Sequence, residues 1–146
     1  MIAFSGFSLT APDASIIGII EEGPEPFAAQ AAATAINIAV DEPIPDLPGN
    51  YLLDHTLSRA DSLAKSKAVA RLVQLRRAGA TIALLSHDEA LLESCADEIW
   101  WLRGGNLIAR GDPADVLAQY RRHVAQALRN SGEQQLPRLS PTMRNM

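Results

Sequence analysis

Several kinds of residue and segment are scarce in this sequence. Its one cysteine, Cys95, cannot form an internal disulfide, which agrees with a reducing compartment. No apolar run approaches the ~20 residues that a membrane-spanning helix needs. The start of the chain also lacks the basic residues and cleavage site of a secretory signal. We therefore expect a cytoplasmic protein with no direct membrane insertion.

Basic residues are also too few for a protein that binds nucleic acid. The formal net charge is −4 and the pI is near 5.3, whereas nucleic-acid binding normally requires a basic stripe that neutralises phosphates. Aromatic residues make up only 5% of the chain, so we expect a core of Ala, Leu, Ile and Val. A length of 146 residues allows one domain.

Short apolar runs alternate with longer segments of helical periodicity, which is typical of an α/β fold. The predicted strands cover residues 4–10, 15–20, 37–40, 51–54, 80–85, 99–102 and 106–109, the last two forming a β-hairpin. The predicted helices cover 28–35, 62–78, a short segment near 91–95, and the residues after Asp112-Pro113. We predict one domain over residues 1–129 and a disordered tail over 130–146.

Three motifs in the second half of the chain follow one another in the order of a known family. Ser86-His87-Asp88 ends one apolar run, residues 99–102 form the next, and Gly111-Asp-Pro113 begins a helix that closes on Tyr120. The set resembles the end of the ATP-binding subunit of ABC transporters, with its switch-histidine loop, strand and G-x-P-x-x-V helix entry. The residues in these motifs are similar to those of the subgroup that exports polysaccharides such as capsule, O-antigen or teichoic acid.

A strand that ends on an acid precedes these motifs. Residues 51–54 followed by His55 resemble the Walker B strand of the family, and residues 57–61 resemble its D-loop. His87 lies 32 residues after His55, close to the family's usual gap between catalytic acid and switch histidine. The resemblance covers residues 51–122. It implies a P-loop NTPase-like, mostly parallel sheet flanked by helices, with a C-terminal β-hairpin and helix.

The phosphate-binding loop of that family is missing. A G-x-x-x-x-G-K-[ST] loop should begin near Glu21, but the chain reads Glu-Glu-Gly-Pro-Glu-Pro-Phe, which puts Phe27 about where the phosphate-binding lysine belongs. The Q-loop, the helical subdomain and the LSGGQ signature are absent too. Only residues 37–50 stand in their place.

The turn after the first buried strand, residues 21–26, is unfavourable for binding a triphosphate. A P-loop presents backbone N–H groups, a helix N-terminus and a lysine to the phosphates. Here Pro24 and Pro26 have no N–H, and Glu21, Glu22 and Glu25 form either a cation site or a solvated acidic loop. One like-charge contact at 4 Å costs about 4 kcal/mol at a dielectric of about 20, whereas a helix dipole offsets only about 0.3–1 kcal/mol. We expect no cofactor to bind tightly, and ATP with Mg²⁺ only if the family function survives.

The resemblance also assigns candidate site residues. Asp54, as the Walker B acid, would hold Mg²⁺ through water and contact the nucleotide. His55 replaces the glutamate that orients the attacking water, and an imidazole can accept a proton. His87 would sense the γ-phosphate, and Asp61 and Ser86 are further nucleotide contacts. The alternatives are that Asp54 anchors a loop and that His87 caps the following helix or hydrogen-bonds the D-loop.

The preferred hypothesis is a degenerate ABC-type ATPase-like protein associated with polysaccharide export. It would be a non-hydrolysing binding or regulatory subunit, cytoplasmic or peripheral at the inner face of the cell membrane. Its partners would be an ABC transporter permease or a complete ATPase subunit. Docking would use residues 57–61 or the hairpin near Trp101, since the packing elements are kept while the phosphate-binding loop is lost. Trp100 and Trp101 alternate faces of one strand, so one should lie in the core and the other should be partly exposed, where it could contact a partner.

Two other hypotheses remain open. The chain could be a working ATP-binding subunit whose incomplete site is finished by another chain, with a homodimer as one possibility. It could instead be a receiver-like signalling domain, because Glu21, Glu22, Asp54 and Ser86 follow strands and imitate an acidic phosphoacceptor pocket. The lysine of such a domain is missing, and Arg103 stands near its place.

Overall fold

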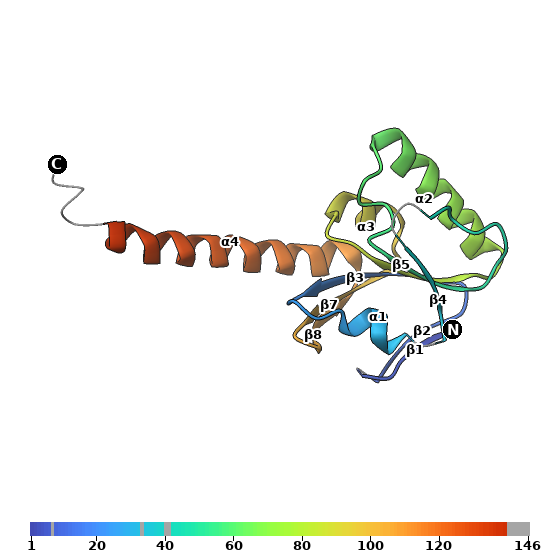
Figure 1. Cartoon of the computed structure of the whole chain (residues 1–146), viewed down its shortest axis with the longest axis horizontal. Helices are drawn as coiled ribbons and strands as arrows, with labels where there is room; N and C mark the ends of the chain where they lie inside the picture. The colour runs from blue at the N-terminus through green and yellow to red at the C-terminus, as the bar shows by residue number, and fades with distance from the viewer. Residues whose placement is uncertain (7, 33, 40–41, 140–146) are drawn as a thin grey trace. The chain divides into compact units, whose positions relative to one another are not determined.

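The computed structural model describes residues 1–6, 8–32, 34–39 and 42–139 (Figure 1). The chain divides into two compact units, residues 1–116 and residues 117–146. The first unit contains the strands of the described residues, and the described part of the second, residues 117–139, lies in the C-terminal helix. None of the helices in the described part combines the length and apolar character that crossing a membrane requires.

The first unit is built on a six-stranded sheet with the strand order β4-β5-β6-β3-β7-β8. Its strands are β3 (Ile16–Glu22), β4 (Ile36–Ile38), β5 (Asn50–Asp54), β6 (Thr81–Leu85), β7 (Glu98–Arg103) and β8 (Asn106–Gly111). All neighbours pair in parallel except β7 and β8, which form an antiparallel hairpin. The predicted α/β class, mostly parallel sheet and C-terminal hairpin are confirmed.

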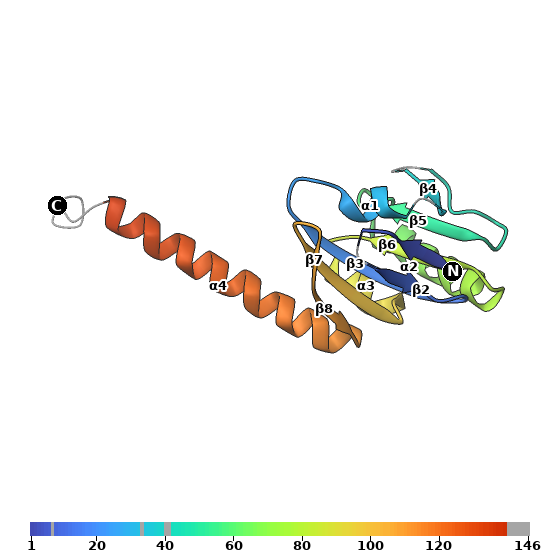
Figure 2. The ribbon, with the colours of Figure 1, turned by 90° about the horizontal axis from the view of Figure 1, so that it is seen from below.

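Helices cover both faces of this sheet within the first unit. In Figures 1 and 2, α2 (Ser62–Arg77) and α3 (Glu89–Cys95) lie on one face, and α1 (Phe27–Ala31) lies on the other. A small hairpin of β1 (Ile2–Phe4) and β2 (Leu9–Ala11) shares the face of α1. Both faces of the sheet are therefore covered, which explains why β6 is buried at all five positions.

The core on the α1 side contains aromatic as well as aliphatic side chains. Trp100 is fully buried and meets the ring of Phe4 edge-on, with ring centroids 5.2 Å apart. Trp101 is also buried, at 4% exposure, so the prediction of one exposed tryptophan is wrong. The reason is a contact between neighbouring strands: the indole N–H of Trp101 donates to Glu22 Oε1 at 2.7 Å, and the Arg103 guanidinium lies 5.3 Å from the Trp101 ring centroid.

Several predicted boundaries differ from the structure. The single strand predicted at 4–10 is the β1–β2 hairpin, and the helix predicted at 28–35 is the five-residue α1. Strand β3 continues through Glu22, where a loop was predicted from Glu21. The strand predicted at 37–40 is β4, and residue 40 lies outside the described residues. Helix α4 (Pro113–Leu139) continues into the predicted tail, of which 140–146 lie outside the described residues.

Candidate functional site

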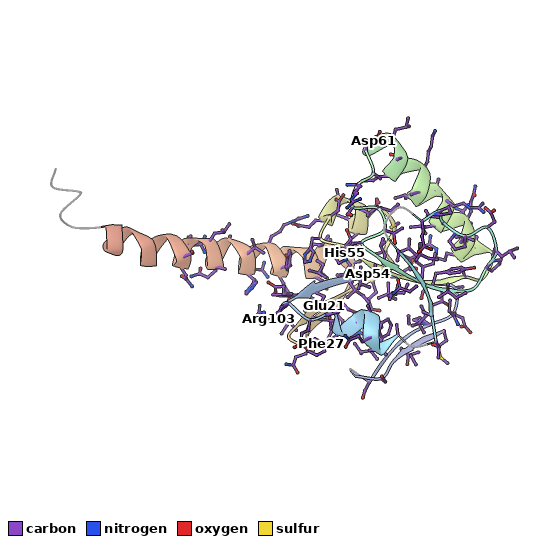
Figure 3. The ribbon with its side chains drawn as sticks, in the orientation of Figure 1. Glu21, Phe27, Asp54, His55, Asp61 and Arg103 are labelled. Carbon is purple, nitrogen blue, oxygen red and sulfur yellow. The ribbon has the colours of Figure 1, made fainter. Side chains whose placement is uncertain are left out.

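A cavity of about 310 Å³ opens at the carboxyl ends of β3, β5 and β6. Glu21 and residues 23–26 line it from the β3–α1 connection, Asp54 and His55 from the end of β5, and His87 from the loop after β6. Ligands of α/β proteins bind at this edge of the sheet because the ends of parallel strands meet there. Figure 3 labels Glu21, Asp54 and His55 together at this edge.

The turn after β5 fixes the orientation of His55. Its backbone N–H donates to the carbonyl of Leu85 at 3.0 Å, and its φ of +56° lies in the left-handed region, which costs a non-glycine residue on the order of 1 kcal/mol. Nδ1 of the ring lies 2.8 Å from Asp54 Oδ1. A carboxylate that orients an imidazole in this way is a general-base arrangement.

His87 lies against the ring of His55. The two ring centroids are 5.6 Å apart and the planes differ by 23°, so the imidazoles are stacked. Burial, together with the nearby charge of His55, lowers the pKa of His87 from 6.5, which favours the neutral imidazole. The residue that caps the following helix is Asp88, whose Oδ1 accepts from the Leu91 N–H at 3.1 Å, so the idea that His87 is this cap is wrong.

Glu21 faces the cavity from the carboxyl end of strand β3, and its side chain reaches the start of α1. Its Oε2 accepts the backbone N–H of Ala28 at 2.9 Å. Burial raises the pKa of Glu21 above 4.5, an effect that the Ala28 hydrogen bond opposes. The Glu21 carboxylate thus occupies an amide at the start of α1, the kind of donor that binds phosphate groups at helix N-termini. The sequence analysis missed this contact and treated Glu21 as part of a cation site or a solvated loop. The amide that Glu21 binds lies only seven residues further along the chain.

The other predicted site residues lie outside the lining of this cavity. Asp61 caps α2, where its Oδ1 accepts the Ala64 N–H at 2.8 Å, and Figure 3 shows it at the start of that helix. Ser86 Oγ accepts the N–H of Asp88 at 3.0 Å. Both side chains thus bond to the backbone at the starts of α2 and α3, and their proposed contacts with a nucleotide stay predictions.

The acids that the receiver hypothesis groups together are separated. Glu21 and Asp54 line the cavity, but the Glu22 carboxylate accepts the Trp101 indole N–H and lies 3.4 Å from Arg103 Nε. Within the described residues, no group of three or more His, Cys, Asp or Glu side chains is arranged to hold a metal ion. Metal binding at Asp54 stays a prediction.

Comparison with known proteins supplies relatives for part of the chain. The chain is 30% identical over 80 residues to the O-antigen export system ATP-binding protein RfbB of Myxococcus xanthus, covering 55% of this chain and 18% of that protein. It is 31% identical over 77 residues to the teichoic acids export ATP-binding protein TagH of Lactococcus lactis, covering 53% and 16%. It is 33% identical over 95 residues to the hemin import ATP-binding protein HmuV of Streptomyces coelicolor, covering 64% and 34%.

Among solved structures, an ATP-binding subunit of an ABC transporter matches with a TM-score of 0.43 and 28% identity, over 49% of this chain and 30% of that one. No protein-family model matches the sequence. The chain spans about a third or less of the length of the relatives described here. Over about half of its length, the chain is a relative of the ATP-binding subunits of ABC transporters, including those for O-antigen and teichoic acid export.

Proposed function

We propose that this chain is a non-hydrolysing, ABC ATPase-like binding or regulatory subunit that acts with a polysaccharide exporter. The observation that carries the proposal is the hydrogen bond from the Ala28 N–H to Glu21 Oε2. The resemblance leads us to expect the phosphate-binding loop at the β3–α1 connection. In this chain the Glu21 carboxylate already accepts a backbone N–H at the start of α1. Export of a polysaccharide is suggested by the relatives named for O-antigen and teichoic acids.

The residues around the cavity do not fit a triphosphate. Glu21, Glu25 and Asp54 bring three carboxylates to a space of about 310 Å³, which is at the small end for ligand pockets. Pro24 and Pro26 provide no N–H donors. Phe27, at the position expected for the lysine, begins α1. Repulsion between carboxylates and phosphates therefore outweighs the attraction that the remaining backbone amides offer.

A second candidate, a working nucleotide-binding subunit completed by another chain, is favoured by one observation. Asp54, His55 and His87 line the same cavity, with Asp54 bonded to His55 and the two imidazoles stacked. In this case a partner chain would provide the missing cationic groups. The difference between the two candidates is whether nucleotide binds and whether Asp54 contributes.

Isothermal titration calorimetry of the full chain with Mg-ATP tests the proposal. We expect no binding with a dissociation constant below about 1 mM, a limit that corresponds to about 4 kcal/mol of binding free energy. Tight binding that Asp54→Ala abolishes would favour the second candidate. Asp46→Ala is the matched control, because Asp46 is an exposed aspartate outside the cavity lining.

The partner half of the proposal needs a separate experiment. Purified permease and intact ATP-binding subunit of a polysaccharide exporter are mixed with the chain, and complex formation and ATPase rate are measured. We expect a complex and a changed rate; no complex together with an unchanged rate would contradict the proposal. The receiver hypothesis is excluded in parallel if acetyl phosphate transfers no phosphate to the chain.

A further inference from the structure

A groove of about 530 Å³ lies between α2 and α3, apart from the cavity at the sheet edge. One wall is a single face of α2, because its lining residues are three or four positions apart: Ser62, Lys65, Ser66 and Val69. The start of α3 and the residue that caps it form the other wall. Small-molecule pockets commonly measure about 300–1,000 Å³, so the groove has room for a ligand of one or two rings.

An ion pair joins the two walls. Lys65 Nζ lies 2.6 Å from Asp88 Oδ2, and the side chains are only 29% and 32% exposed, so both belong to the wall of the groove. The hydrogen bond from Lys65 lowers the pKa of Asp88 below 3.8, so this carboxylate stays ionised at neutral pH. No other charged residue lines the groove, and the two charges cancel. The groove is therefore suited to a neutral ligand, since Asp88 would repel a free phosphate from Lys65.

Three serine hydroxyl groups also line the groove. Ser94 Oγ donates to the Leu91 carbonyl at 2.6 Å, which leaves the Ser94 oxygen as an acceptor. Ser62 and Ser66 have no hydrogen-bond partner for their hydroxyl groups within the described part of the chain, so each can both donate and accept. They are one helical turn apart, about 5.4 Å along the axis, a distance that one sugar ring spans. A ligand with several hydroxyl groups satisfies such a set.

Apolar side chains lie beside these polar groups. Val69, Ala90 and Leu91 line the groove, and Leu91 is buried. A sugar ring has a face of C–H groups and a rim of hydroxyl groups, so its face can rest on these side chains while its rim bonds to the serines. A wholly apolar ligand would instead take water away from the hydroxyl groups without replacing its hydrogen bonds.

We propose that the groove between α2 and α3 is a binding site for a neutral saccharide of one or two rings. The C–H face of the sugar lies on Val69 and Leu91. Its hydroxyl groups bond to Ser62 and Ser66 and to the N–H groups of Lys65 that Asp88 does not use. The inference goes beyond the proposed function, because it concerns a second cavity and holds whether or not the first one binds nucleotide.

Amide NMR spectra of the full, isotope-labelled chain, titrated with N-acetylglucosamine and with its β1,4-linked disaccharide, test the site. We expect saturable shifts that concentrate at residues 62–69 and 88–94, with a dissociation constant of about 10 mM or below. Inorganic phosphate at the same concentrations should leave these residues unshifted. The Mg-ATP calorimetry concerns the other cavity, so each experiment can fail without the other.

Matched variants identify the groups that bind the sugar. Ser66→Ala removes one hydroxyl group and should weaken binding by about two- to tenfold, whereas Lys65→Met removes charged donors and should weaken it by about tenfold or more. The controls are Gln74→Ala and Lys67→Met, exposed residues of α2 outside the lining, and both should bind like the original chain. Circular dichroism confirms that each variant is folded.

Three results would each overturn the proposal. The first is an absence of shifts at about 100 mM sugar, or shifts that lie outside the groove. The second is inorganic phosphate shifting the same residues as the sugar, because the groove would then be an anion site. The third is an equal loss of binding in Ser66→Ala and Gln74→Ala, because the sugar would then not contact the hydroxyl group of Ser66.

Discussion

The two sides of the sheet-edge cavity are held by very different means. On the β5–β6 side, α2 has sixteen residues and an aspartate cap, and α3 is capped by Asp88, which also pairs with Lys65. On the β3–α1 side, α1 has five residues, and the residue before it, Pro26, provides no side-chain cap. The backbone N–H of Ala28, in the first turn of α1, instead donates to the Glu21 carboxylate of the preceding strand. Asp54, His55 and His87 are therefore held in place by the packing and helix caps of the β5–β6 side, and not by a phosphate-binding loop.

The largest effect that tests this comparison concerns stability. Leu72 is buried in α2 at 1% exposure, and Leu72→Ala should lower the free energy of unfolding by about 2–5 kcal/mol through the cavity it leaves. Ala28→Gly in α1 should cost only about 1–2 kcal/mol, from helix propensity and one buried methyl. Urea unfolding followed by circular dichroism measures both. Equal losses would show that α1 is as important to the fold as α2.

The same contrast explains how far the sequence predicts the molecule. Strands β5 and β6 and helix α2 follow from local patterns, namely apolar runs, helical spacing and the stop at Gly79, whose φ is +104°. The hydrogen bond between Glu22 and Trp101 joins residues 79 positions apart, and no local pattern contains it. The burial of Trp101 was therefore mispredicted. The contact of Glu21 with Ala28 was missed because the acids were interpreted as a loop, although two of them, Glu21 and Glu22, belong to strand β3.

For the site, motif order carried more information than local periodicity. The resemblance named Asp54, His55 and His87, and the structure brings the three to one cavity. It also named Asp61 and Ser86, whose side chains bond to the backbone at the starts of α2 and α3. A motif records which residues a family uses, but it does not show which of them still face a cavity after the neighbouring loop has changed. The catalytic and binding roles of all five remain predictions.

Substitutions at the helix caps of α1 and α2 test the same comparison, with smaller expected changes in stability. Asp61→Ala removes the acceptor of the Ala64 N–H and should lower stability by about 1 kcal/mol. Pro26→Ser gives α1 a residue that can cap it and should change stability by less than that, because Glu21 already satisfies the Ala28 amide. Thermal unfolding compares the two variants. A loss in Pro26→Ser larger than that in Asp61→Ala would mean that the rigid proline, and not the carboxylate, holds the β3–α1 side.

The ionisation of Glu21 gives a pH-dependent test. Burial raises its pKa above 4.5, so the folded state binds the proton more readily than the unfolded chain does. The contribution of this group to stability is then lost as pH rises from about 4.5 through the folded-state pKa. Gln cannot ionise but still accepts the Ala28 N–H, so Glu21→Gln should gain stability relative to the original chain between pH 4 and 7. Urea unfolding across this range measures the difference.

A second variant separates charge from hydrogen bonding at the same position. Glu21→Ala also removes the charge, but it leaves the Ala28 N–H without its acceptor, which should cost about 0.5–2 kcal/mol relative to Glu21→Gln at every pH. If the stability difference between Glu21→Gln and the original chain is the same at pH 4 and pH 7, burial does not control this carboxyl.

The smallest expected effect is on His87, from the opposite side of the cavity. Its pKa is lowered from 6.5 first by burial and second by the charge of the stacked His55, while Glu22 acts in the opposite direction. His55→Gln removes only the second cause, so the pKa of His87 should rise part of the way back toward 6.5, which NMR titration of the ring protons measures. Because the folded-state pKa is lowered, His87 makes the fold less stable as pH falls below about 6.5, and His55→Gln should weaken that dependence. An unchanged pKa would mean that burial alone sets it. The two stacked imidazoles would then line the same cavity without influencing each other's ionisation.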